Sequence, residues 1–129
     1  METRNLKARL NNGETVYGPF LKIPSGSVIH VLGLAGFDFA IIDLEHSSLS
    51  LESAEALVRA ARATSLSPVI RVGENTPTAV LHALDMGRQV SSFLTFQIGS
   101  RQKQQLGMPG FIHRVNGEWI CMQQLPIMG

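Results

Sequence analysis

The first 87 residues alternate between two hydrophobic patterns. Short, unbroken apolar runs predict strands that are buried on both faces, as in a parallel sheet. Longer segments, with apolar residues three and four positions apart, predict amphipathic helices. The predicted strands are residues 16–23, 37–43 and 68–72, and the predicted helices are residues 5–10, 28–36, 51–62 and 77–87.

The order of these elements is one helix followed by three strand–helix units. Such alternation is typical of a parallel sheet whose strands are joined by right-handed helical crossovers. The sequence therefore predicts an α/β fold in which the carboxyl ends of the strands meet at one edge of the sheet.

Chemically versatile side chains gather where two of these strands end. The second strand is followed by Asp43, Glu45 and His46, and the third strand ends near Arg71. Because ligands and catalytic groups of parallel α/β folds lie at the carboxyl ends of strands, we expect a base and a guanidinium to converge on one cleft. The alternative is a helix cap with a surface histidine and a surface arginine, and spacing alone leaves it open.

The hydrophobic pattern breaks after Gly87. Residues 88–129 have no sustained helical or strand period. Residues 1–87 contain ten alanines and no glutamine, whereas residues 88–129 contain seven glutamines and no alanine. The first part has seven basic and nine acidic residues, and the second has four and one. We therefore divide the chain into residues 1–87 and an unrelated tail, residues 88–129, which we expect to be disordered.

The whole-chain composition narrows the class of protein. An apolar fraction of 44% and a charged fraction of 16% are ordinary for a globular domain. No apolar run approaches the roughly 18 residues of a membrane span, and the N-terminus lacks the apolar segment of a signal peptide. The single cysteine, Cys121, rules out an internal disulfide and indicates a reducing compartment, so we expect a cytoplasmic protein. A net charge of +1 without a basic patch makes neither nucleic acid nor a membrane an expected partner.

Four motifs, in this order, resemble the HpcH/HpaI aldolase and citrate lyase family. They are Gly-Phe-Asp at 36–38, Ile-Asp-Leu-Glu-His at 42–46, Pro-Val-Ile-Arg-Val at 68–72 and Leu-Asp-Met-Gly at 84–87. The resemblance covers residues 4–87 and is to the metal-dependent aldolases of 2-keto-3-deoxy sugar acids and 4-hydroxy-2-oxo acids. It implies the first three β/α units of a (β/α)8 TIM barrel of the pyruvate/phosphoenolpyruvate superfamily, in a protein that forms homo-oligomers.

The resemblance also implies roles for individual residues. His46 matches the family's catalytic histidine, Asp85 the aspartate paired with it, and Arg71 the pyruvate-binding arginine. Asp43 and Glu45 match acidic groups near a metal-bound water. The implied enzyme is a carbon–carbon lyase, a class II aldolase that cleaves a small hydroxy-oxo acid to pyruvate and an aldehyde with Mg, Mn or Co. Such cleavage needs a base for the hydroxyl proton and positive charge for the enolate, which are roles that histidine and arginine suit.

The chain departs from the family directly after the last motif. The family continues with a strand that reads approximately Gly-Val-Val-Pro-His, whereas residues 88–92 are Arg-Gln-Val-Ser-Ser. Nothing in the tail matches the family's metal-ligating glutamate and aspartate, so we expect this truncated chain to bind no metal and to be inactive. A shifted reading frame would explain the departure. In the new frame Met108-Pro109 must encode alanine and Trp119-Ile120 must encode aspartate, and one permitted back-translation restores the missing strand.

Two other functions stay open. One is a lyase of the same superfamily that acts on citramalyl or malyl thioesters, although Leu44-Glu45-His46 fits the sugar-acid aldolases better. The other is a non-catalytic module that binds a carboxylate or associates with a complete barrel. Metal-dependent release of pyruvate would separate an enzyme from such a module.

Overall fold

The computed structural model describes residues 6–74, 76–87, 94–98, 111–115 and 118–123, with side chains up to residue 86. The helices of this part of the chain are α1 (Leu6–Asn11), α2 (Gly26–Leu34), α3 (Leu51–Ala61) and α4 (Pro77–Gly87). The strands are β1 (Phe20–Leu21), β2 (Phe39–Asp43), β3 (Ser67–Arg71), β4 (Leu94–Ile98), β5 (Phe111–Val115) and β6 (Glu118–Gln123).

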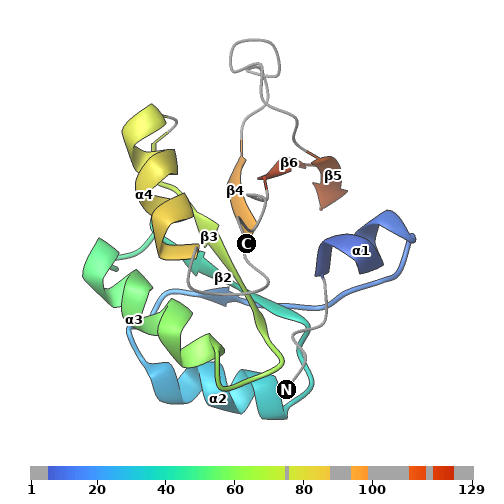
Figure 1. Ribbon diagram of the computed structural model, residues 1–129, viewed down its shortest axis with the longest axis horizontal. Coiled ribbons are helices and arrows are strands. Elements are labelled where there is room, and N and C mark those ends of the chain that lie inside the picture. Colours follow the sequence, from blue (N-terminus) through green and yellow to red (C-terminus); the bar gives the residue numbers. More distant parts are fainter. Residues whose placement is uncertain (1–5, 75, 88–93, 99–110, 116–117, 124–129) are drawn as a thin grey trace.

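These strands form one sheet in the order β1-β2-β3-β4-β6-β5 (Figure 1). The strands from β1 to β4 run parallel, whereas β6 runs antiparallel to both β4 and β5. The units β1–α2, β2–α3 and β3–α4 follow one another along the chain, as the alternating pattern predicts. The expected α/β architecture of three β/α units is therefore confirmed, and within the described residues the sheet stays open rather than closing into a barrel.

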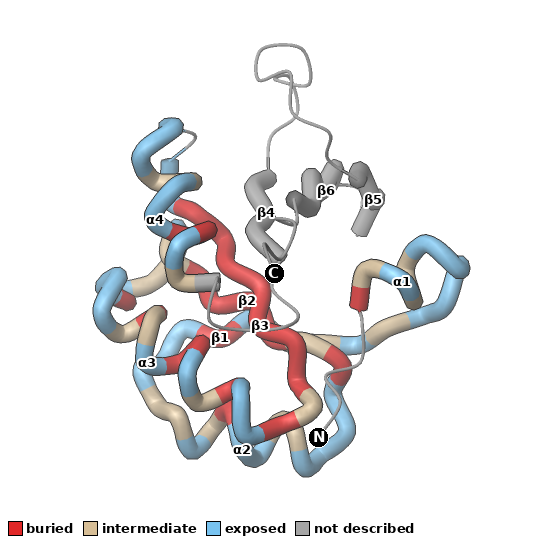
Figure 2. The backbone as a smooth tube through the Cα atoms, in the orientation of Figure 1, coloured by how far each residue is buried: buried red, intermediate tan, exposed pale blue. Residues whose placement is uncertain are grey.

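Hydrophobic residues pack on both faces of the parallel part of the sheet. One face is covered by α2, α3 and α4, and α1 lies on the other (Figure 1). The larger core includes Ile42 and Leu57 on the helix-covered face, and the smaller core joins Ile41 to Leu6 of α1. Successive residues of a strand point to opposite faces, so β2 and β3 are buried along almost their whole length (Figure 2).

The first strand is shorter than the predicted residues 16–23. Only Phe20 and Leu21 form the strand, although the Tyr17 and Pro19 carbonyls also accept hydrogen bonds from the backbone of β2. Pro19 has no N–H group to donate, so a regular ladder cannot extend through it. Gly18 approaches β2 so closely that an added Cβ would lie 2.3 Å from the Phe39 carbonyl oxygen.

The helix α3 forms as its pattern predicts. The Ser50 side chain accepts a hydrogen bond from the Ser53 N–H at 3.1 Å, which caps the helix N-terminus. One stripe of the helix is buried, and its members are Ala54, Leu57, Val58 and Ala61. The neighbouring helix α2 ends at Leu34, and Gly36 follows with a φ of 89°, a conformation that glycine adopts without strain.

Regular structure continues beyond Gly87. The sequence pattern shows no period there, yet β4 pairs in parallel with β3, and β5 and β6 form an antiparallel pair. Cross-strand pairing therefore supplies order that the local pattern does not indicate. Within the described residues, no helix has both the length and the apolarity needed to cross a membrane.

Candidate active site

The candidate site lies at the carboxyl ends of β2 and β3. The two strands are parallel neighbours, and Asp43 stands directly opposite Arg71 in their register. The Leu44 N–H, just beyond β2, donates to the Arg71 carbonyl oxygen at 3.0 Å, which extends the pairing past the strand end. The prediction that the groups following β2 share one rim of the sheet with Arg71 is therefore confirmed.

Asp43 is the most heavily hydrogen-bonded side chain of this group. Its side chain is fully buried. The Oδ1 atom accepts from Arg71 Nε at 2.9 Å and from the backbone N–H groups of Glu45 and His46 at 3.0 and 3.1 Å. The Oδ2 atom accepts from Arg71 Nη2 at 2.5 Å. The carboxylate therefore joins β3 to the turn that carries Glu45 and His46.

These contacts decide the ionisation of Asp43. Burial raises the pKa of the carboxyl group, since a charged group loses its hydration inside the protein. The hydrogen bonds from Arg71 and from the two backbone N–H groups, with the positive charge of Arg71, act in the opposite direction and prevail, lowering the pKa from 3.8 to about 2. Asp43 is therefore a carboxylate at neutral pH, and its charge is matched within the fold.

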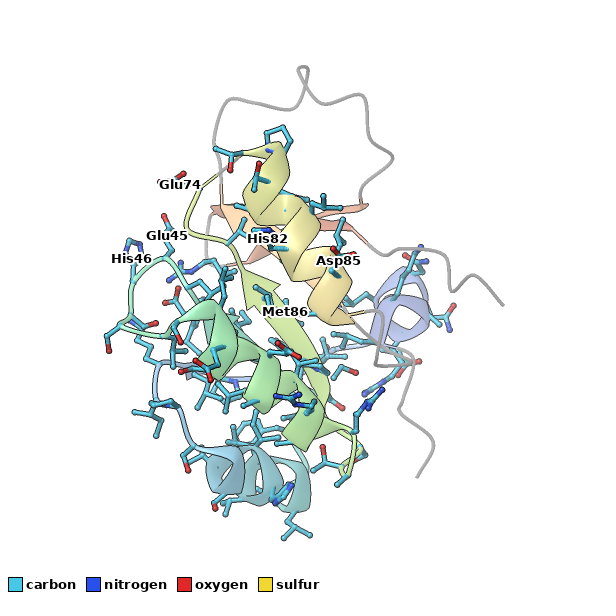
Figure 3. The ribbon with its side chains drawn as sticks, turned by 60° about the vertical axis from the view of Figure 1, so that its left-hand side comes forward. Glu45, His46, Glu74, His82, Asp85 and Met86 are labelled. Carbon is cyan, nitrogen blue, oxygen red and sulfur yellow. The ribbon has the colours of Figure 1, made fainter. Side chains whose placement is uncertain are left out.

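Glu45 and His46 lie on the turn after β2 and face solvent (Figure 3). Glu45 Oε2 is 3.5 Å from Arg71 Nε, and Glu45 Oε1 is 3.6 Å from His46 Nε2. The His46 side chain is 62% exposed. The Ser47 hydroxyl donates to the Asp43 carbonyl oxygen and accepts from the Leu49 N–H, which holds the turn after His46. The structure thus brings together four of the five predicted site residues, with His46 at the outer edge.

The fifth predicted residue, Asp85, lies elsewhere. It is an exposed residue in the last turn of α4. Figure 3 shows it on a part of α4 remote from the turn that carries His46. A helix that follows a parallel strand runs back toward the amino end of the sheet, so its last turn lies away from the carboxyl rim. The structure therefore does not bring Asp85 to His46, and their pairing stays a prediction.

Two further residues of the site come from β1 and were not predicted. Phe20 places its ring 4.8 Å from the Arg71 guanidinium carbon, a cation–π distance. Lys22, directly after β1, places Nζ 3.9 Å from Asp43 Oδ2. The missed signal is the alternation within the predicted strand, because positions 20 and 22 share a face and the parallel register sets Lys22 beside Asp43.

The described residues contain few side chains that could ligate a metal at this site. Within that part of the chain, no three histidine, cysteine, aspartate or glutamate side chains are grouped closely enough to hold an ion. At the site itself, both oxygens of Asp43 already accept hydrogen bonds from Arg71. Glu45 and His46 are therefore the side chains of this site that could still act as metal ligands.

A pocket of about 470 Å³ lies on the helix side of the same rim. Its walls come from the turn after β2, the loop after β3 and α4, and they include Leu49, Val72, Glu74 and His82. Figure 3 shows Glu74 on the same side of the view as Glu45 and His46, and His82 on α4. The charged cluster around Asp43 does not line this pocket.

Known proteins similar to this chain include aldolases, a citrate synthase and proteins of the HpcH/HpaI aldolase/citrate lyase family. No family profile matches the chain. A hydroxypyruvate/pyruvate aldolase from Roseobacter denitrificans is 34% identical over 83 residues, which are 64% of this chain and 32% of that protein. The solved structure of the citrate synthase SbnG matches 64% of this chain and 34% of its own, with a TM-score of 0.60 and 42% identity. An HpcH/HpaI aldolase/citrate lyase family protein from Burkholderia cenocepacia matches 65% of this chain and 34% of its own, with a TM-score of 0.60 and 36% identity.

The chain spans about a third of the length of these relatives. The similarity to the solved structures extends over about two thirds of this chain and includes both sequence identity and fold. Over that part of its length, the chain is similar in sequence and fold to proteins of the HpcH/HpaI aldolase/citrate lyase family.

Proposed function

We propose that this chain carries the histidine and arginine side of an aldolase active site. The reaction is the cleavage of a 2-keto-3-deoxy sugar acid or another 4-hydroxy-2-oxo acid to pyruvate and an aldehyde. The observation that supports the proposal is the placement of Arg71, Asp43 and the His46 turn at one carboxyl rim, joined by hydrogen bonds of 2.5–3.1 Å. The aldolase names of the curated relatives point to the same class of reaction.

In this proposal Arg71 binds the carboxylate or enolate of the pyruvate unit. Its guanidinium has five N–H donors, and Asp43 engages Nε and Nη2. Asp43 fixes the orientation of that guanidinium, and the Phe20 ring stacks against it. A positioned guanidinium favours the negative charge that develops on an enolate oxygen.

His46 is the proposed base for the hydroxyl proton. An imidazole changes its protonation near neutral pH, so it can take a proton and later return it. Asp43 accepts a hydrogen bond from the His46 backbone N–H, so the turn is fixed while the ring faces solvent. The same carboxylate thereby positions both functional groups.

Metal dependence is part of the proposal, and nothing in residues 88–129 matches the metal-ligating glutamate and aspartate that the resemblance implies. We therefore expect the 129-residue chain alone to release no pyruvate from 4-hydroxy-2-oxo acids, with or without Mg²⁺, Mn²⁺ or Co²⁺. A coupled assay of pyruvate release tests this, with the chain at micromolar concentration. Turnover comparable to that of ordinary enzymes would show that the site is complete without further residues.

Binding of pyruvate tests the role of Arg71 separately from turnover. Saturation-transfer NMR on the full chain should detect pyruvate binding, and Arg71→Lys should weaken it at least about tenfold, because lysine keeps the charge but loses the planar donor fork. Arg59→Lys, on the outer face of α3, is the matched control. If both variants bind pyruvate as well as the unaltered chain does, the proposed role of Arg71 is wrong.

The similarity to the citrate synthase SbnG supports a second candidate function. Its 42% identity exceeds the 34% of the hydroxypyruvate/pyruvate aldolase. The reaction would then be formation rather than cleavage of a carbon–carbon bond, at a substrate that also carries carboxylates. The non-catalytic alternative, a module that binds a carboxylate or associates with a complete barrel, uses the same arginine. Pyruvate binding that depends on Arg71, with no turnover in either direction in the presence of the metals, would favour this alternative.

A further inference from the structure

Three charged residues form one row across the parallel strands. Leu21 of β1 is paired with Ile42 of β2, and Asp43 of β2 is paired with Arg71 of β3. The next position after Leu21 is Lys22, so the row reads lysine, aspartate, arginine. Paired residues of parallel strands point to the same face, and this is the face opposite α2, α3 and α4. Measured contacts agree, since Asp43 Oδ2 is 2.5 Å from Arg71 Nη2 and 3.9 Å from Lys22 Nζ.

The two cations of this row are held very differently. The Arg71 side chain is 7% exposed and donates two hydrogen bonds to Asp43. The Lys22 side chain is 54% exposed, and its ammonium lies beyond hydrogen-bond distance of the same carboxylate. Because Asp43 already accepts from Arg71 and from two backbone N–H groups, Lys22 adds little to satisfying it. Positive charge therefore extends from the buried arginine to an exposed lysine.

An apolar surface accompanies the two cations. Phe20 precedes Lys22 by two positions, so both side chains lie on the same face of β1. The Phe20 ring lies 4.8 Å from the Arg71 guanidinium carbon and is 49% exposed. A short carbon chain that begins at Arg71 can therefore rest on this ring and end near Lys22.

We propose that Lys22 determines specificity by binding the second anionic group of a dicarboxylic oxo acid. The inference rests on the proposed role of Arg71 as the site of the first carboxylate. Two cations separated by a buried carboxylate match two separated carboxylates on a ligand. The negative charge of a phosphate is concentrated on one group, whereas the positive charges of the row lie on two separate residues. Glu45 carries negative charge near Arg71 Nε and His46, whereas Lys22 lies near Asp43 Oδ2, so repulsion by Glu45 favours a ligand that extends toward Lys22.

Two acids of equal length separate this role from general attraction of anions. The acids 2-oxoglutarate and 2-oxopentanoate share a five-carbon skeleton, and only the first ends in a second carboxylate. Binding of each to the full chain is measured by NMR titration at low salt. We expect the unaltered chain to prefer 2-oxoglutarate about threefold to fivefold, the range of an exposed ion pair, and to lose that preference as salt is added.

Lys22→Met should abolish the preference by weakening 2-oxoglutarate alone, and Lys22→Arg should retain it. Arg59→Met is the control, because its side chain is also 54% exposed but lies on α3 beside Glu55. Equal affinities of the unaltered chain for the two acids would overturn the inference, as would a Lys22→Met variant that keeps the preference or weakens both acids equally. If 2-oxopentanoate still binds in an Arg71-dependent manner, the proposed function stands without this inference. If neither of the two acids nor pyruvate binds, the proposed function and the inference about Lys22 are both wrong.

Discussion

Asp43 links the two strands of the site through a single carboxylate. It accepts hydrogen bonds from Arg71 on β3 and from the backbone of the turn that carries Glu45 and His46. A buried ion pair adds little over an apolar pair of the same shape, but removal of one partner leaves the other charge buried and unmatched. The residue therefore affects stability and the geometry of the proposed active site together.

Replacement of this carboxylate should cost stability at neutral pH. Asp43→Asn keeps the size of the side chain but removes the charge opposite Arg71, so we expect the free energy of unfolding to fall by about 3 kcal/mol. Urea denaturation at pH 7 measures the change. Glu55→Gln is the control, because its partner Arg59 lies on the surface and such pairs contribute about 1 kcal/mol or less. Similar losses in the two variants would contradict the importance given to the buried pair.

The same carboxylate predicts how stability depends on pH. The pKa of Asp43 falls from 3.8 to about 2 in the folded protein, so the unfolded chain binds this proton more readily than the folded one. The stabilisation is therefore fully present above about pH 4 and is lost as the pH falls toward about 2.

Urea denaturation between about pH 4.5 and about pH 2 tests this. The unaltered chain should lose about 2 kcal/mol more than Asp43→Asn over that interval. Parallel pH profiles for the two proteins would show that Asp43 does not titrate as described.

At the scale of elements, close approach of backbones sets the path of the first strand. Gly18 lies against β2, where an added Cβ would meet the Phe39 carbonyl oxygen at 2.3 Å. Beside it, the Asp38 carboxylate accepts from the Tyr17 N–H at 2.9 Å and pairs with Arg9 in the last turn of α1. The entry into β1, and with it the position of Lys22, therefore depends on contacts with β2.

Gly18→Ala should disturb this approach. The new methyl group would clash with backbone that cannot move away easily, so we expect a loss of about 1–3 kcal/mol in the free energy of unfolding. Thr15→Ala, at an exposed position in the same connection, should change it by less than about 0.5 kcal/mol. The two variants are compared by urea denaturation, and an unchanged Gly18→Ala protein would mean that β1 can shift away from β2 at no cost.

At the scale of the whole molecule, the chain corresponds to about a third of the length of its relatives. Its hydrophobic sequence pattern breaks after Gly87. We propose that residues 88–129 are read from a shifted frame after the loss of one base near that codon. The alternative is that residues 88–129 are a selected sequence, and the parallel pairing of β4 with β3 supports this alternative. The antiparallel pair β5–β6 has no counterpart in a barrel of parallel strands.

The nucleotide sequence around codon 87 decides between these two origins. If a base was lost, its restoration should replace Arg88 and the following residues with a Gly-Val-Val-Pro type strand. The restored protein should cleave hydroxy-oxo acids only with a divalent ion, and His46→Ala should slow it about a hundredfold to ten-thousandfold. If no shifted frame continues the barrel pattern, the tail is a selected sequence and the frameshift proposal fails.

The sequence by itself determined the β/α units and the rim at which chemistry would lie. Unbroken apolar runs in β2 and β3 and the helical stripe of α3 are local patterns, and the structure has each of these elements where the pattern predicts it. Strand order followed from the general preference for right-handed crossovers. That strand order was enough to predict that Arg71 lies near the residues after β2.

Tertiary structure alone decided the partners of each charged group. No local pattern indicates that Asp43 accepts from Arg71 and from its own turn, or that Asp85 lies away from His46. Alternation puts Lys22 on the same face as Phe20, but only the register with β2 sets it beside Asp43. Tertiary structure also determined the strands after Gly87, because hydrophobic periodicity does not predict their pairing. The physical reason is that hydrophobic periodicity records which face of an element is buried, whereas hydrogen bonds and ion pairs depend on register and approach between segments far apart in the chain.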